Sequence, residues 1–149
     1  MNPDFSDLLA EFNAHGVEYL VVGAHALAAH GHVRATKDLD VWVNSTPVNA
    51  ARARAALAAF GAPVDQLTVE DLSTPGVIFQ IGVEPVRIDV MTSIDAVVFA
   101  DAWRARVETT FGGQPVHVLS RDDLIRNKRT SGRLQDLADI EALGGHASG

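Results

Sequence analysis

The sequence predicts an α/β (α+β) fold in which helices flank a mixed β-sheet. Runs with helical apolar spacing alternate with short β-rich runs along the 149 residues. With 47% hydrophobic and 21% charged residues, the composition is typical of a folded protein that can bury a sizeable core. No repeat, low-complexity tract or linker divides the chain. We therefore expect a single domain over residues 1–149.

The first elements are a helix, a strand and a second helix. Asn2 and Pro3 are typical of a helix start, and Gly16 of a helix end. Between them, apolar residues recur at amphipathic spacing: Phe5, Leu8, Leu9 and Phe12. Residues 18–22 (EYLVV) predict a buried strand that stops at glycine, and the alanine-rich residues 24–31 predict a helix.

The middle of the chain predicts three strands around one long helix. Residues 38–43 (DLDVWV) alternate between the two faces of a strand. Thr46-Pro47 starts a helix that runs to Phe60, and an irregular stretch follows it. Two further strands are expected at 77–82 and 86–91, the second with Arg87, Asp89 and Met91 on one face.

The last third predicts a hairpin between helices. A short helix is expected at 95–103, and residues 105–120 form a hairpin that turns at Gly112-Gly113. Ser120 caps a helix over 121–130, and a final helix follows over 134–143. The predicted order is α-β-α-β-α-β-β, a hairpin and α-α.

Composition excludes several classes of protein. The absence of cysteine excludes disulfides and thiolate metal sites. No signal peptide or membrane-spanning run is visible, which predicts a cytoplasmic protein without a membrane partner. The net charge of −7 argues against general DNA binding. Five of the 12 basic residues nevertheless fall close together, at Arg121, Arg126, Lys128, Arg129 and Arg133. That segment suits a compact anionic ligand or is simply a solvated face.

Three aspartates are the candidate metal ligands. Asp38 and Asp40, two positions apart on one strand, project from the same face about 7 Å apart. Asp89 lies between aliphatic residues on a later strand, and it joins them if the two strands share a core. Carboxylates gathered in this way repel one another unless a cation neutralises them, and oxygen ligands suit Mg²⁺ or Mn²⁺. The alternative is that these acids only line the solvent face of a half-buried sheet.

A glycine upstream favours the metal-site interpretation. Gly23 lies between a strand and a helix, where glycine permits an unusual backbone angle and a close approach. Backbone N–H groups at such a helix start can meet phosphate. The histidines at 25, 30 and 32 are poor candidates, because their spacing does not stack them and Mg²⁺ prefers oxygen. For Trp42, packing is favoured over a role in a base pocket.

The segment VVGAHALAAHGHVRATKDLDVWV resembles the signature of the DNA polymerase β-like nucleotidyltransferases, with Asp89 in VRIDVM as the later acid. The segment NKRTSGRLQDLADIEAL is similar to the end of small bacterial members, including the abortive-infection type IV toxins of toxin–antitoxin systems. The similarity covers about residues 18–143, which would form the core of a nucleotidyltransferase domain.

The resemblance implies a metal-dependent transfer of a nucleoside monophosphate from an NTP such as ATP to a hydroxyl acceptor, with release of pyrophosphate. Asp38 and Asp40 would bind metal, and Asp89 would hold the catalytic metal and activate the acceptor. Nucleotide-binding positions would be Gly23, Ala24, Arg34, Lys37, Lys128 and Arg133. Asp136 and Asp139 are expected to pair with basic residues or face water.

One position departs from the family pattern, because Ala24 stands where many members have Ser or Gly and lacks a hydroxyl for phosphate. This departure favours one rival interpretation, a catalytically decayed module that binds nucleotide or a partner protein, whereas the intact aspartates argue against it. A second rival is a metal-dependent phosphodiesterase or nuclease, because clustered acids with Mg²⁺ also serve hydrolysis. The acceptor, which the sequence does not identify, would be a protein, a tRNA end or a small hydroxylated molecule.

Overall fold

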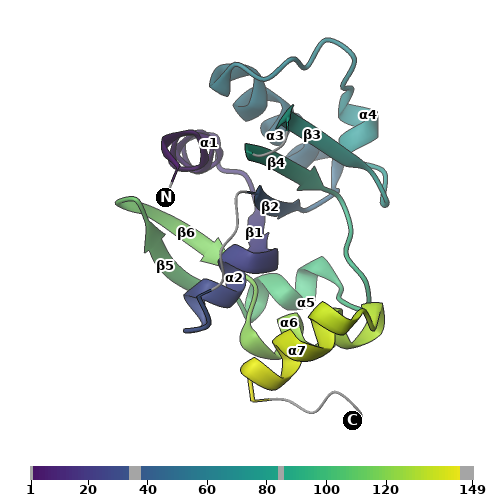
Figure 1. Cartoon of the computed structure of the whole chain (residues 1–149). Helices are drawn as coiled ribbons and strands as arrows, with labels where there is room; N and C mark the ends of the chain where they lie inside the picture. The colour runs from purple at the N-terminus through teal and green to yellow at the C-terminus, as the bar shows by residue number, and fades with distance from the viewer. Residues whose placement is uncertain (1, 34–37, 84–85, 145–149) are drawn as a thin grey trace.

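A computed structural model describes residues 2–33, 38–83 and 86–144. Its elements, in chain order, are α1 (Pro3–Ala14), β1 (Tyr19–Val22), α2 (Gly23–Ala29), β2 (Asp38–Val43), α3 (Pro47–Phe60), α4 (Val69–Leu72), β3 (Ile78–Val83), β4 (Val86–Met91), α5 (Phe99–Arg104), β5 (Val107–Phe111), β6 (Gln114–Val118), α6 (Arg121–Ser131) and α7 (Leu134–Ala142). Figure 1 shows this arrangement. None of the described helices is long and apolar enough to span a bilayer.

The strands form one mixed sheet in the order β3-β4-β2-β1-β6-β5. The neighbours β2 and β4 are parallel, as are β1 and β6, whereas the remaining neighbours are antiparallel. The expected mixed sheet with flanking helices is thereby confirmed.

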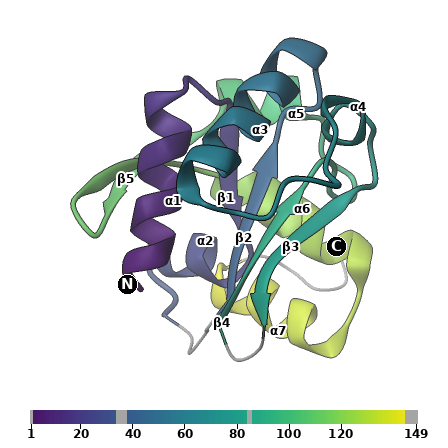
Figure 2. The same cartoon turned by 90° about the horizontal axis from the view of Figure 1, so that it is seen from above.

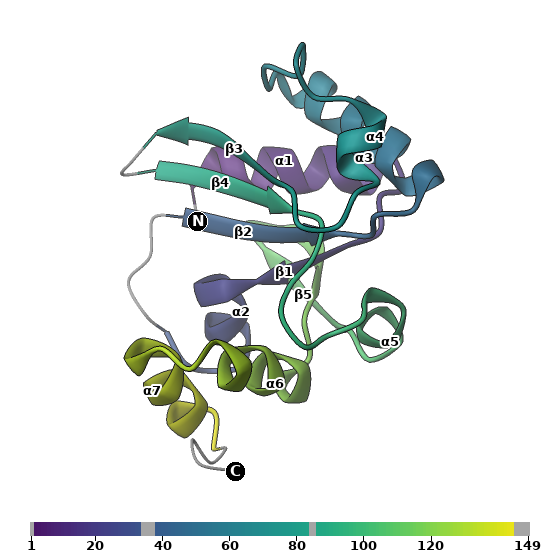
Figure 3. The same cartoon turned by 90° about the vertical axis from the view of Figure 1, so that its right-hand side faces the viewer.

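Helices cover the sheet on both sides. Figure 3 shows α1, α3 and α4 above strands β1 and β2, and α2, α6 and α7 below these strands. Figure 2, seen from above, shows α1 and α3 lying over the strands. The apolar positions predicted for α1 are all buried, and every residue of β1 is buried. Burial of apolar surface contributes about 25 cal/mol per Å² to folding. The helices on the two sides of the sheet therefore stabilise it by covering its apolar side chains.

Polar caps and glycines fix the helix and turn boundaries much as the sequence predicts. Asn2, Thr46 and Ser120 each accept a backbone N–H at the start of α1, α3 and α6. Gly112 and Gly113 both have positive φ at the β5–β6 turn, as the hairpin requires.

Two local expectations are corrected. The stretch after α3 is not wholly irregular, since Thr68 and Asp71 form a reciprocal capping box that starts the short helix α4. The helix expected at 95–103 begins later, at Phe99. Before it, Ile94 and Val97 form an isolated bridge around Ala96, whose φ of 65° is incompatible with a right-handed helix.

Candidate active site

The three predicted aspartates lie on the two parallel strands at the centre of the sheet. Asp40 of β2 is the register partner of Asp89 of β4, and Asp38 is the partner of Arg87. Residues in register on neighbouring strands point to the same face. Asp38, Asp40 and Asp89 therefore share one face, as the alternation predicts, while Leu39 and Val41 are buried on the other.

Gly23 packs directly against one of these carboxylates. It is the first residue of α2, with φ of 67°. A Cβ added here would lie 2.3 Å from Oδ2 of Asp40. The unusual backbone angle predicted for this glycine is present, and the group that lies next to it is the carboxylate of Asp40. The approach of a phosphate to Gly23 stays a prediction.

The site carries more negative charge than its surroundings compensate. Burial, followed by the charges of Asp89 and Asp38, raises the pKa of Asp40 to about 6, against the opposing charges of Arg87 and Lys128. A raised pKa means that the carboxylate is poorly stabilised in its ionised form. A cation entering next to Asp40 would relieve that cost.

Arg87 is the side chain that partly neutralises the site. Its Nε donates to Oδ1 of Asp89 at 2.9 Å, and its Nη2 lies 3.7 Å from Oδ2 of Asp38. Sequence reasoning did not single out Arg87, although its position two residues before Asp89 on the same strand face was a usable signal.

The chemistry of the site fits a divalent cation. The acidic side chains that converge are all carboxylates, the oxygen ligands that Mg²⁺ and Mn²⁺ accept, and they are incompletely compensated. In residues 2–33, 38–83 and 86–144, however, no three His, Asp or Glu side chains are already arranged around a single point that could hold a metal. Asp38, Asp40 and Asp89 would hold the ion after the side chains adjust.

Two cavities flank Asp40. One, of about 310 Å³, is lined by Gly23, Ala24, Asp38, Asp40, Lys128, Arg133, Gln135 and Asp136. The other, of about 370 Å³, shares five of these residues and adds the apolar side chains of Ile78, Met91 and Ile94. Every predicted nucleotide-binding residue that the structure describes therefore lines one cavity. Arg34 and Lys37 lie outside the described residues.

Lys128 reaches this cavity but is engaged in a buried ion cluster. Its Nζ lies 2.9 Å from Oδ2 of Asp139 and 3.4 Å from Oδ1 of Asp136, and its side chain is only 8% exposed. Arg133 and Ser131 also hydrogen-bond to Asp136. Although burial works in the opposite direction, these partners hold the pKa of Asp136 below its usual value. The expected pairing of both acids with basic residues is confirmed.

The five basic residues of the C-terminal part of the chain lie at two separate places. Lys128 and Arg133 line the cavities beside Asp40. Arg121, Arg126 and Arg129 instead line a separate groove of about 430 Å³ with residues of α6 and Gly144. The five basic residues therefore do not form one binding surface.

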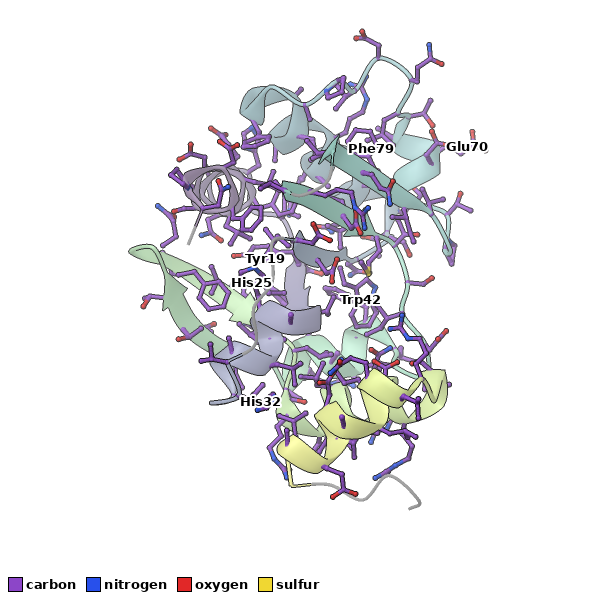
Figure 4. All side chains as sticks on the ribbon, in the orientation of Figure 1. Tyr19, His25, His32, Trp42, Glu70 and Phe79 are labelled. Carbon is purple, nitrogen blue, oxygen red and sulfur yellow. The ribbon has the colours of Figure 1, made fainter. Side chains whose placement is uncertain are left out.

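Trp42, His25 and His30 contact other parts of the fold. Trp42 is buried, with its ring 4.9 Å from that of Phe99. His25 packs edge-on against Phe5, and His30 Nε2 bonds to the Leu119 carbonyl at 2.8 Å. Figure 4 shows His25 well separated from His32.

Solved structures with the same fold include nucleotidyl-transferring enzymes. The antibiotic-resistance factor ANT(2'')-Ia aligns with a TM-score of 0.65 at 14% identity, covering 95% of this chain and 80% of that one. A second ANT(2'')-Ia structure, in complex with adenylyl-2''-tobramycin, aligns with a TM-score of 0.63 at 13% identity over 93% and 84% of the chains. The lincomycin-bound lincosamide antibiotic adenylyltransferase LnuA gives a TM-score of 0.61 at 14% identity, covering 97% and 96%.

At these identities, the likeness shows the fold and not the substrate. No curated protein matches the sequence. The sequence matches DUF6036, described as a nucleotidyltransferase of unknown function, over residues 6–144. The nucleotidyltransferase fold observed here agrees with that match, and the chain belongs to the DUF6036 family.

Proposed function

We propose that this chain is a metal-dependent nucleotidyltransferase that moves a nucleoside monophosphate from an NTP to a hydroxyl acceptor. The observation that carries the proposal is the in-register placement of Asp40 and Asp89 on parallel strands, with Asp38 on the same face. Asp40 lines a cavity, leaves no room for a Cβ at Gly23, and has a pKa raised by burial and by the neighbouring acids. Such features are typical of functional sites.

In the proposed reaction, the acceptor oxygen bonds to the α-phosphorus and the bond from that phosphorus to the β-bridging oxygen breaks. Pyrophosphate leaves, and Asp89 takes the hydroxyl proton. A divalent cation held by Asp38, Asp40 and Asp89 would supply charge stabilisation to the phosphates. Backbone groups of Gly23 and Ala24, with Arg133, would orient the triphosphate in the cavity they line.

The shape of the site supports two ligand subsites. The cavity on the Ala24 side is lined mainly by polar and charged residues, which suits a triphosphate. The cavity on the other side of Asp40 has apolar walls at Ile78, Met91 and Ile94, which suit a base or an acceptor. LnuA, which aligns over 97% of this chain and 96% of its own, is a lincosamide antibiotic adenylyltransferase. That match favours a small hydroxylated acceptor over a protein or tRNA for this chain.

The test is transfer of label from each α-³²P-labelled NTP, with Mg²⁺ or Mn²⁺, to small hydroxylated compounds, bulk tRNA and protein, together with pyrophosphate release. We expect one acceptor class to be labelled, and D40N and D89N to lose at least a hundredfold of the rate. D101N is the matched control, because Asp101 is an exposed acid on α5 away from the cavity.

The outcomes separate this function from its rivals. Metal-dependent nucleotide binding without transfer to any class would support a binding module, and hydrolysis of phosphodiesters would support a nuclease. A toxin role, which rests on the resemblance of the C-terminal segment, predicts that expression arrests growth and that D89N relieves the arrest. Normal growth under full expression would remove it.

A further inference from the structure

Arg87 holds the acidic site through several contacts at once. Its Nε and Nη2 bond to the two carboxylate oxygens of Asp89 at 2.9 and 3.2 Å. Its Nη2 is 3.7 Å from Oδ2 of Asp38, and its backbone N–H donates to Oδ1 of Asp38 at 3.2 Å. One side chain therefore bridges an acid of β2 and an acid of β4.

Arg87 contacts oxygens of two of the three carboxylates that a divalent cation would need, those of Asp38 and Asp89. A carboxylate lone pair directed at a guanidinium N–H cannot also be directed at a metal ion. The two positive charges would also repel each other at such short range. Consistent with this, the described side chains are not arranged for metal binding, although their chemistry suits it.

We propose that Arg87 is an internal counter-ion of this site, which neutralises Asp38 and Asp89 before a divalent cation binds and competes with that cation for them. The inference rests on the proposed metal site. The inference goes beyond that site because it assigns Arg87 a role of its own, which is to weaken the binding of free metal ions. Binding of the metal through the lone pairs that Arg87 now contacts would require the guanidinium to turn away from them.

The position of Arg87 makes such a departure feasible. Its side chain is 27% exposed, so it already meets solvent and can turn further outward. An arginine–carboxylate pair of this partial exposure is much weaker than a sealed one. Lys128 differs from Arg87, because its side chain is only 8% exposed.

The first test measures Mn²⁺ affinity without nucleotide, from the loss of the free-ion EPR signal. R87Q should bind about tenfold more tightly than the wild type, and R87K, which keeps the charge, should stay near the wild type. R126Q is the matched control, because Arg126 is an exposed arginine paired with Asp123 in the separate groove. Its Mn²⁺ affinity should not change.

A second measurement uses the wild-type protein, so that it does not depend on how R87Q folds. The Arg87 Nε–H resonance, assigned by its loss in R87K, should show slow solvent exchange without metal and faster exchange as Mg²⁺ is added. Equal Mn²⁺ affinity in R87Q and wild type, no measurable binding by either protein, or an unchanged Nε–H signal would overturn the inference. In that case, nucleotide transfer by the wild type would still support the proposed function. Conversely, tighter Mn²⁺ binding by R87Q with no nucleotide transfer by the wild type would support the inference and contradict the proposed function.

Discussion

Two groups of aspartates in this molecule have the same chemistry and opposite electrostatics. On the sheet, Asp40 has a raised pKa because burial and its neighbours Asp89 and Asp38 disfavour its charge. Between α6 and α7, Asp136 has a lowered pKa despite its burial, because Arg133, Ser131 and Lys128 favour its charge. In the first group, Arg87 contacts Asp38 and Asp89 but the pKa of Asp40 stays raised, whereas in the second group the partners of Asp136 outweigh its burial. Local compensation, and not the presence of acids, therefore separates a candidate catalytic site from a structural ion cluster.

The largest effect on stability is expected at Lys128. K128M leaves Asp136 and Asp139 buried without their shared cation, and we expect a loss of about 3–5 kcal/mol in unfolding free energy. Urea denaturation measures this loss. R126M on the same helix removes an exposed, paired arginine and should cost less than about 1 kcal/mol. A stable K128M protein that fails only to bind nucleotide would instead make Lys128 a ligand-binding group.

Neutralising one acid from each group should change stability in opposite directions. D136N removes a carboxylate that is stabilised by its partners, so we expect a loss of about 2 kcal/mol at pH 7.5. Because the folded pKa of Asp136 lies below its ordinary value of 3.8, the stabilisation it gives is present above that pH and is lost as the pH falls below it. The deficit of D136N should shrink on acidification, as denaturation curves at several pH values would show.

D40N should stabilise the protein. The folded pKa of about 6 exceeds the ordinary value of 3.8, so ionised Asp40 costs stability above pH 6 and neutral Asp40 costs none below pH 4. We expect a gain of about 1–2 kcal/mol at pH 7.5 that disappears near pH 4. A gain that is independent of pH would contradict this account. Together with the expected loss of transfer, the gain would identify a site that trades stability for activity.

Gly23 and Gly16 together test how tightly the Asp40 side chain is packed. G23A introduces a methyl group into the space of the Asp40 carboxylate, whereas G16A faces no atom within 4 Å at almost the same φ, 66°. Both variants carry the backbone cost of a positive φ, about 1 kcal/mol. We expect G23A to lose about 1 kcal/mol more than G16A and to bind Mn²⁺ more weakly. Equal behaviour of the two variants would mean that the Asp40 side chain moves aside freely.

The smallest effect is expected at Arg133. Its side chain is 79% exposed, so its bond to Asp136 should contribute less than about 1 kcal/mol to stability. R133Q should therefore remain folded while its apparent affinity for Mg²⁺–NTP falls, as measured by the nucleotide-induced shift in Tm. An unchanged shift would remove Arg133 from the triphosphate site.

Local sequence patterns predicted most of the sheet and the shared face of the acids. The alternation in DLDVWV and VRIDVM is a property of each strand alone, and so the orientations of Asp40 and Asp89 could be deduced. Their parallel register could not, because it depends on how the chain between β2 and β4 crosses over. The short helix α4 was missed because its four residues are too few to show the apolar spacing of a helix.

The sequence did not predict the contacts that form between elements far apart in the chain. Lys128 stands among Arg126, Asn127 and Arg129, a polar context that predicts exposure. Only the packing of α7 against α6 buries it. Arg87 was visible as a neighbour of Asp89 along its strand, but its contact with Asp38 depends on the same crossover that sets the register.

The ion cluster between α6 and α7 also has a consequence for biosynthesis. Lys128 leaves the ribosome before Asp136 and Asp139, the acids that allow it to be buried, and Asp136 with Gln135 lines the cavity beside Asp40. A nascent chain that has formed the sheet still lacks one wall of the site and still carries an unburied lysine. Completion of the cavity beside Asp40 therefore depends on the last described helix, α7, which supplies Gln135 and Asp136 to its lining.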